Sequence, residues 1–171
     1  MALERLADVP ERLAHVGGVA RAAESAGLRL ALEECAVLVA AAWVHDIGYA
    51  RSIARTGFHP LDGAVFLRDH DFPDSLVSLV AFHSGAVVEA EQRGLADQLS
   101  AFAAPPGELL DVLTFSDMTT GPDGSEVDSG DRVREILERY APDDVVHRSV
   151  ARSAPDLLAT VTRVRSRLAN S

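Results

Sequence analysis

The 171-residue chain contains no lysine, and arginine supplies all 16 of its basic residues. Acidic residues number 26, so the formal net charge is -10 at pH 7. A nucleic-acid or anionic-membrane surface needs a basic face, which this balance does not provide. We therefore expect neither a nucleic acid nor a membrane as a partner. The arginines near the C-terminus are too few to change this expectation: Arg163, Arg165 and Arg167.

Cys35 is the only cysteine, which excludes an internal disulfide and a metal site built from several thiolates. It lies in an apolar helical stretch, so a small buried side chain is expected there. The chain also lacks an apolar run that approaches the roughly 20 residues needed to span a bilayer. Its first residues, M-A-L-E-R-L-A-D, lack the apolar core of an export signal. These absences make the cytoplasm the expected location.

The apolar residues follow a helical period along almost the whole chain, and no segment alternates as a strand would. The predicted fold class is therefore an all-α, single-domain helical bundle over residues 1–171, a length that suits one domain with a proper core. Gly27 is expected to end the first helix, and Gly17-Gly18 inside it marks a weak point or a close approach. The predicted helices are about 10–26, 31–45, 50–55, 60–70, 73–84 and 107–119, then a loop at 121–130 and further helices broken near Pro142 and Pro155.

The dipeptide His-Asp occurs twice, and its surroundings separate the two copies. His70-Asp71 lies in the polar stretch R-D-H-D-F-P, which predicts a solvated turn with Asp71 as a cap for the next helix. His45-Asp46 instead follows nine apolar residues, Ala36 to Val44, at the end of the helix that they form. Neither side chain has a polar helical face on which to reach water. A buried carboxylate costs several kcal/mol unless it is paired or bound to a cation.

Helical spacing places three further polar side chains on apolar faces, those of His15, His83 and Asp117. His59 precedes Pro60 at the start of a helix, where its ring can turn toward a neighbouring site. Taken singly, an inward histidine is more often bonded to the backbone, and an inward aspartate more often paired with arginine, than bound to a metal. Together these groups would need many private partners, whereas a pair of divalent cations such as Fe, Mn or Zn satisfies them all.

The order of these residues resembles the HD superfamily of metal-dependent phosphohydrolases, over about residues 12–124. The resemblance implies an HD-type helical fold with a metal-site core at about 10–125 and C-terminal helices at about 128–169. His59 in G-F-H-P-L-D-G-A and His83 in A-F-H-S-G-A are similar to the added histidines of the two-metal subset. Spacing and flanks look most like the bacterial diadenosine tetraphosphate hydrolases within that subset.

The same resemblance implies two divalent transition metals per chain, Fe, Mn or similar. Asp46 would bridge them, and two histidines, His59 and His83, would complete the second metal. The first metal would take His15, His45 and Asp117. Water activated by these metals would attack a phosphate ester, a nucleotide or a nucleoside polyphosphate, which makes a small phosphate compound the expected partner.

Many members of the superfamily carry a lysine three residues after the aspartate, where this chain has Tyr49. Arg51 and Arg55 follow and are candidates to bind phosphate as forked donors, which adds them to Asp46 as candidate catalytic residues. A solvated face is the alternative interpretation of both arginines. The loop T-T-G-P-D-G after Asp117 either borders the substrate pocket or is only a loop.

Two other functions stay open. A few relatives with the same ligand order use a di-iron pair to activate O₂ and oxidise a small substrate, and the ligands alone do not exclude this reaction. A non-catalytic regulator that binds a nucleotide or a metal would be expected to lack ligands, and none is missing here. The C-terminal helices either cover the core or pair with a second subunit, so a homodimer is also open.

Overall fold

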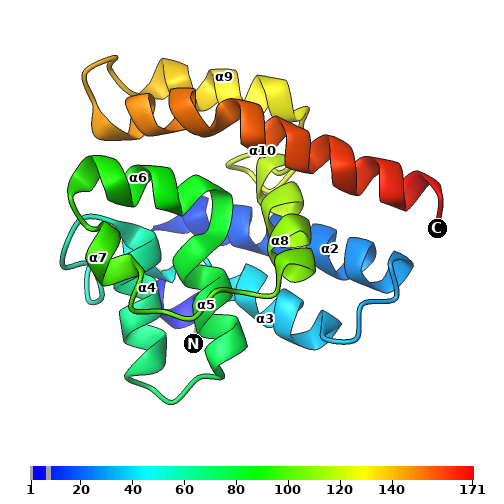
Figure 1. The fold of residues 1–171 in the computed structure, drawn as a ribbon, viewed down its shortest axis with the longest axis horizontal. Helices are drawn as coiled ribbons and strands as arrows, with labels where there is room; N and C mark the ends of the chain where they lie inside the picture. The colour runs from blue at the N-terminus through cyan, green and yellow to red at the C-terminus, as the bar shows by residue number, and fades with distance from the viewer. Residues whose placement is uncertain (1, 7–8) are drawn as a thin grey trace.

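The computed structural model describes residues 2–6 and 9–171, and these form a bundle of helices (Figure 1). The described part of the chain contains no strand; a bridge of the antiparallel type joins Thr120 and Glu126. The all-α prediction is confirmed. The elements are α1 (Ala2–Arg5), α2 (Pro10–Arg29), α3 (Cys35–Val44), η1 (Ile47–Tyr49), α4 (His59–Arg68), α5 (Asp74–Phe82), η2 (His83–Gly85), α6 (Ala86–Arg93), α7 (Ala96–Leu99), α8 (Gly107–Met118), α9 (Ser129–Arg139) and α10 (Val145–Ala169), where η marks a 3₁₀ turn.

The glycines of α2 serve packing and do not end the helix. α2 continues beyond Gly27, so the prediction that it ends there was wrong. A Cβ added at Gly27 would lie 2.6 Å from Cys35 Sγ, and one added at Gly18 would lie 2.5 Å from the Gly124 carbonyl oxygen. The close approach that Gly17-Gly18 predicted therefore falls at Gly18, against the loop that follows α8. Cys35 was expected to be buried, but it is only half-buried.

The prediction that Pro155 breaks the last helix was wrong, because α10 runs through this residue. Pro155 is exposed, whereas Leu157 and Val161 of the same helix are buried. Packing of that buried face holds the helix through the residue whose backbone hydrogen bond is lost.

A predicted short helix and a predicted helix cap were also wrong. The helix expected at 50–55 is a turn that follows η1. Asp71 does not cap α5, because Pro73 is the N-cap and Asp71 lies in the preceding turn with a φ of 58°. The exposed turn predicted for His70-Asp71 is confirmed.

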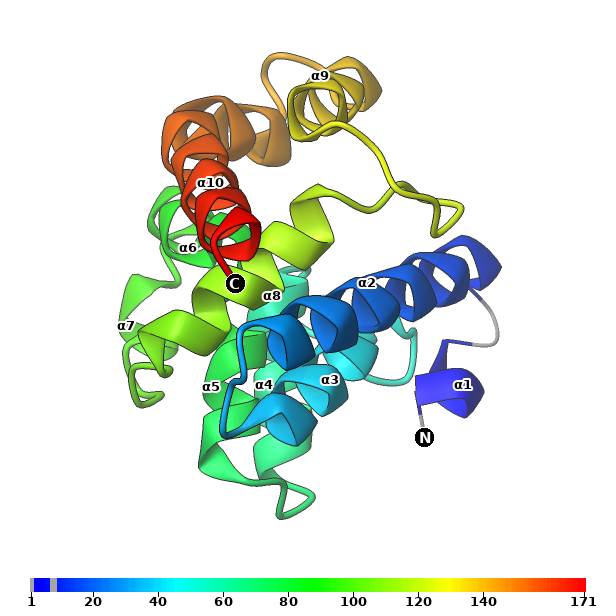
Figure 2. The ribbon, with the colours of Figure 1, turned by 90° about the vertical axis from the view of Figure 1, so that its right-hand side faces the viewer.

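The helices form two layers. In Figures 1 and 2, α9 and α10 lie above the other helices, and α10 crosses over α8. Val164 and Leu168 of α10 belong to the same buried core as the helices of the lower layer, so α10 covers this core. A smaller cluster joins α8, α9 and α10: Met118, Val133, Leu157 and Val161. Within the described residues, no helix has the length and apolar character that a membrane span requires.

Candidate metal centre

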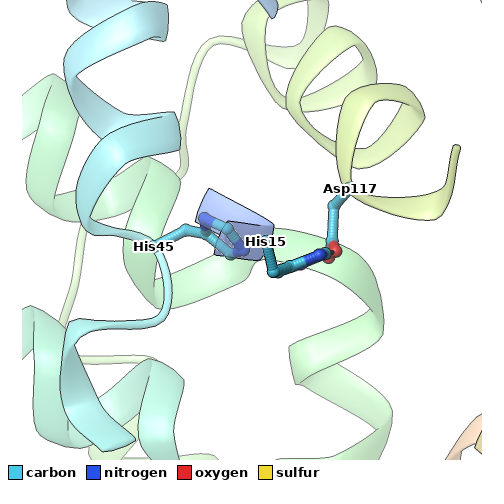
Figure 3. Close-up of side chains that lie close together, drawn as sticks. All are labelled: His15, His45 and Asp117. Carbon is cyan, nitrogen blue, oxygen red and sulfur yellow. Dashed lines mark hydrogen bonds and ion pairs between the residues drawn. The ribbon is translucent and has the colours of Figure 1, made fainter. Parts of the chain in front are cut away.

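The six predicted metal ligands meet at one place in the lower layer. His15 comes from the second turn of α2, and Asp117 comes from the last turn of α8. Figure 3 shows these two side chains close to that of His45, which follows the end of α3. The remaining ligands follow the ends of α3 and α5 or begin α4: His45, Asp46, His83 and His59.

Three of these histidines share one hydrogen-bond pattern. The Nδ1 atoms of His15, His45 and His83 lie 3.1, 2.8 and 2.7 Å from the carbonyl oxygens of Gly121, Ala42 and Val80. A carbonyl oxygen only accepts, so each Nδ1 donates, and each neutral ring presents its Nε2 lone pair to the centre. Metal-binding histidines are typically oriented in this way. The loop after Asp117 thus orients His15 through the carbonyl of Gly121.

Two of the three lone pairs that this pattern creates have no adequate donor among the described side chains. His45 Nε2 is buried without a hydrogen-bond partner. His15 Nε2 faces Asp117 Oδ1 at 3.0 Å, where a cation or a second proton must lie between two acceptors. His83 Nε2 faces His59 Nε2 at 3.1 Å, a contact that a choice of tautomer can satisfy. Imidazole nitrogens and carboxylate oxygens in this arrangement suit divalent transition metals.

Asp46 lies buried between the histidines and an arginine. Its Oδ1 is 3.3 Å from His59 Nε2 and 3.7 Å from His45 Nε2, and its Oδ2 accepts a hydrogen bond of 3.0 Å from Arg12 Nη1. Burial alone would raise the pKa of Asp46, but His45, Arg12 and His59 hold that pKa below its usual range. Burial lowers the pKa of His59 and of His83. Neutral rings beside ionised carboxylates are the protonation states that bind metal.

Asp117 is held on both of its oxygens. Oδ1 faces His15, and Oδ2 accepts a hydrogen bond from Ser84 Oγ. Burial would raise the pKa of Asp117, but His15, His45 and His83 lower it well below its usual range. Ser84 has φ 44° and ψ 50°, a left-handed conformation that residues other than glycine rarely adopt. Backbone strain of this kind is concentrated at functional sites. Sequence reasoning missed Ser84, although its position directly after His83 was a signal for it.

A family model for the HD domain matches residues 12–143 of the chain. The chain belongs to the HD-domain family. No curated protein and no solved structure matches it. HD domains bind divalent metals and are typical of metal-dependent phosphohydrolases, which agrees with the donor set found here.

Two groups in this HD domain place their ligand atoms close enough to hold an ion. His15, His45 and Asp117 form one group, and the ligand atoms of each group lie within 4.8 Å of one another. The second group contains His45, Asp46 and His83, so His45 belongs to both. His59 lies beside the second group through its contacts with Asp46 and His83.

A cavity of about 90 Å³ separates this centre from α9. Arg51 and Arg55, the predicted phosphate-binding residues, do not line it, because both are exposed on the turn after η1. The Arg55 guanidinium donates to the carbonyls of Ala54 and Ser52 in its own turn. The structure therefore gives the predicted role of Arg51 and Arg55 no support and favours a solvated face.

Sequence reasoning missed the arginines that do line the cavity: Arg12, Arg132 and Arg139. Arg12 lies three residues before His15, so helical spacing places both on one face of α2, a signal that was available. Its guanidinium lies over the Tyr49 ring at 4.1 Å, and Tyr49 stacks on His59 at 4.1 Å. The Arg12 guanidinium thus packs against Tyr49, the residue three positions after Asp46.

Proposed function

We propose that this HD domain is a hydrolase of phosphate esters or nucleotides, nucleoside polyphosphates included, with two divalent metals. The observation that carries the proposal is the convergence of the Nε2 lone pairs of His15, His45 and His83 on Asp46 and Asp117. Metals held by these side chains and His59 supply Lewis-acid stabilisation of phosphoryl oxygens and a water of lowered pKa. The carboxylate of Asp46 lies between His45 and His59, so it would help to hold both metals.

Arg12 is the protein group best placed to bind the reacting phosphoryl group. Its guanidinium lines the cavity and contacts Asp46, so its charge lies beside the metal centre. Asp46 also raises the pKa of Arg12 against the opposing effect of burial, which keeps the guanidinium charged. Stacking on Tyr49 fixes its plane, and a fixed guanidinium binds phosphoryl oxygens as a fork.

The size of the cavity limits how a substrate binds. Its volume of about 90 Å³ is well below the roughly 300–1,000 Å³ of sites that enclose a small molecule. The phosphoryl end of a substrate suits such a space, whereas a whole nucleotide does not. We infer that the phosphoryl end enters and that the rest of the substrate extends out of the cavity or displaces α9.

Elemental analysis and a substrate screen test this function. The protein is purified without chelator or a metal-binding tag, and its metals are counted per chain. About two transition metals, with hydrolysis of phosphate esters or nucleoside polyphosphates, would support the proposal. A count of one metal per chain would indicate that His59 and His83 line the pocket and do not bind metal.

The screen also tests the two rival functions. Iron without any phosphoryl hydrolysis, together with O₂ consumption on a small hydroxylated compound, would overturn the hydrolase in favour of an oxygenase. Metal and nucleotide binding without any turnover would favour the regulator.

A further inference from the structure

Arg132 is buried to a degree that is unusual for an arginine. The side chain is 6% exposed. Arg132 belongs to α9, which lies in the upper layer (Figure 1). Its Nε is buried and has no hydrogen-bond partner among the described residues. A buried donor without a partner costs free energy and needs an explanation.

The carboxylates near Arg132 do not supply that partner. Glu135 accepts a hydrogen bond from Arg132 Nη1, but it also accepts one from Arg139 Nη2, so one carboxylate serves two guanidinium groups. Glu89, a third acid of the cavity wall besides Asp46 and Asp117, pairs with Arg93 at 2.7 Å. The α9 wall of the cavity therefore carries two guanidinium groups that share one carboxylate, and the Nε donor of Arg132 remains unpaired.

We propose that Arg132, with Arg139 beside it, binds a second anionic group of the substrate, such as a phosphoryl group that does not react. Both arginines line the same cavity as the metal ligands. A substrate with two anionic groups has one at the metals and the other on α9, where the guanidinium fork satisfies the free Nε. This role rests on the proposed hydrolase function and makes Arg132 a residue that determines specificity.

Kinetics on two substrates test the role of Arg132. Arg132→Met should raise KM for adenosine diphosphate about tenfold or more, the size of one charge-assisted hydrogen bond. The values of kcat and KM for p-nitrophenyl phosphate, which has one phosphoryl group, should change less than about threefold. Arg134→Met is the matched control, because Arg134 is on the same helix, 66% exposed and paired with Asp131. Equal losses on both substrates, or no loss on either, would overturn the proposal.

Binding without turnover separates this proposal from the hydrolase function. Calorimetry on the full chain with its metals compares orthophosphate with imidodiphosphate, a pair of phosphoryl groups joined by a nitrogen that resists hydrolysis. The wild type should prefer imidodiphosphate, and Arg132→Met should lose most of this preference while orthophosphate binding stays unchanged. An unchanged preference would refute the role of Arg132. A lost preference in a protein that hydrolyses nothing would instead refute the hydrolase and leave the anion site standing.

Arg132→Lys is a second variant that tests the proposal if Arg132→Met does not fold. Lysine keeps the charge but lacks both the Nε donor and the planar fork. It should still lose much of the preference for imidodiphosphate, while its circular dichroism matches that of the wild type. A full preference in Arg132→Lys would show that charge alone suffices and would overturn the assignment to the Nε fork.

Discussion

Asp46→Asn is the smallest change in shape that removes the proposed bridge between the metals. Asp46 Oδ1 lies 3.3 Å from His59 Nε2, and its Oδ2 lies 3.0 Å from Arg12 Nη1. Asparagine has nearly the same volume, so the helix ends around it should keep their places. It loses the negative charge, however, and neutral amide groups are poor ligands for transition metals. We expect the variant to lose most of its bound metal and its turnover.

The magnitude follows from linkage between metal binding and folding. A ligand that binds only the folded chain at a concentration of 100 Kd stabilises it by about 2.7 kcal/mol. A domain of this size gains roughly 2–4 °C in Tm per kcal/mol. Saturating Mn²⁺ should therefore raise the Tm of the chelator-treated wild type by about 5–10 °C, and that of Asp46→Asn by less than about 2 °C.

Differential scanning calorimetry with and without Mn²⁺ measures this shift, and elemental analysis counts the retained metal. Each variant is compared with its own metal-free form, which removes the effect of the Arg12 ion pair on the baseline. His70→Ala is the control, because His70 is exposed and its ring lies 2.7 Å from the Phe66 carbonyl, away from the metal centre. If Asp46→Asn kept both the metal and the full shift, or if His70→Ala lost them, the assignment of the centre would be refuted.

Two further substitutions test how neighbouring residues support the centre. Ser84→Ala removes the donor to Asp117 Oδ2, so metal affinity measured by titration should fall about 10–100-fold, the usual effect of losing a group that orients a ligand. An affinity equal to that of the wild type would contradict this role. Gly18→Ala would put a Cβ 2.5 Å from the Gly124 carbonyl oxygen, and the resulting displacement should lower the free energy of unfolding by about 1–3 kcal/mol in urea titration. Gly107→Ala is its control, because a Cβ there meets nothing within 4 Å, and equal effects of both substitutions would refute the packing argument.

Local pattern was enough to predict the all-α class, several of the helices and the candidate ligands, but not α6 (Ala86–Arg93) or α7 (Ala96–Leu99). The 3.6-residue period gave the helical class, and the cost of burying a charge singled out His45-Asp46 from His70-Asp71. The same pattern misled at Gly27 and Pro155, where intrinsic preferences favour a helix end. Tertiary packing overrides such preferences, because the buried face of α10 and the close contact of α2 with α3 stabilise more than the local cost.

The sequence by itself determined the helical class and singled out six candidate ligands. Five were visible as inward polar side chains from the apolar residues one turn away, and His59 was singled out by its place before Pro60. Only the tertiary structure decided which cations face the centre. Arg51 and Arg55, near Asp46 in sequence, point to solvent, whereas Arg132 and Arg139 reach the cavity because α9 lies across it. Helical periodicity says which face of a helix is buried, but it does not say which helix packs opposite that face. That choice depends on how the whole core fills space.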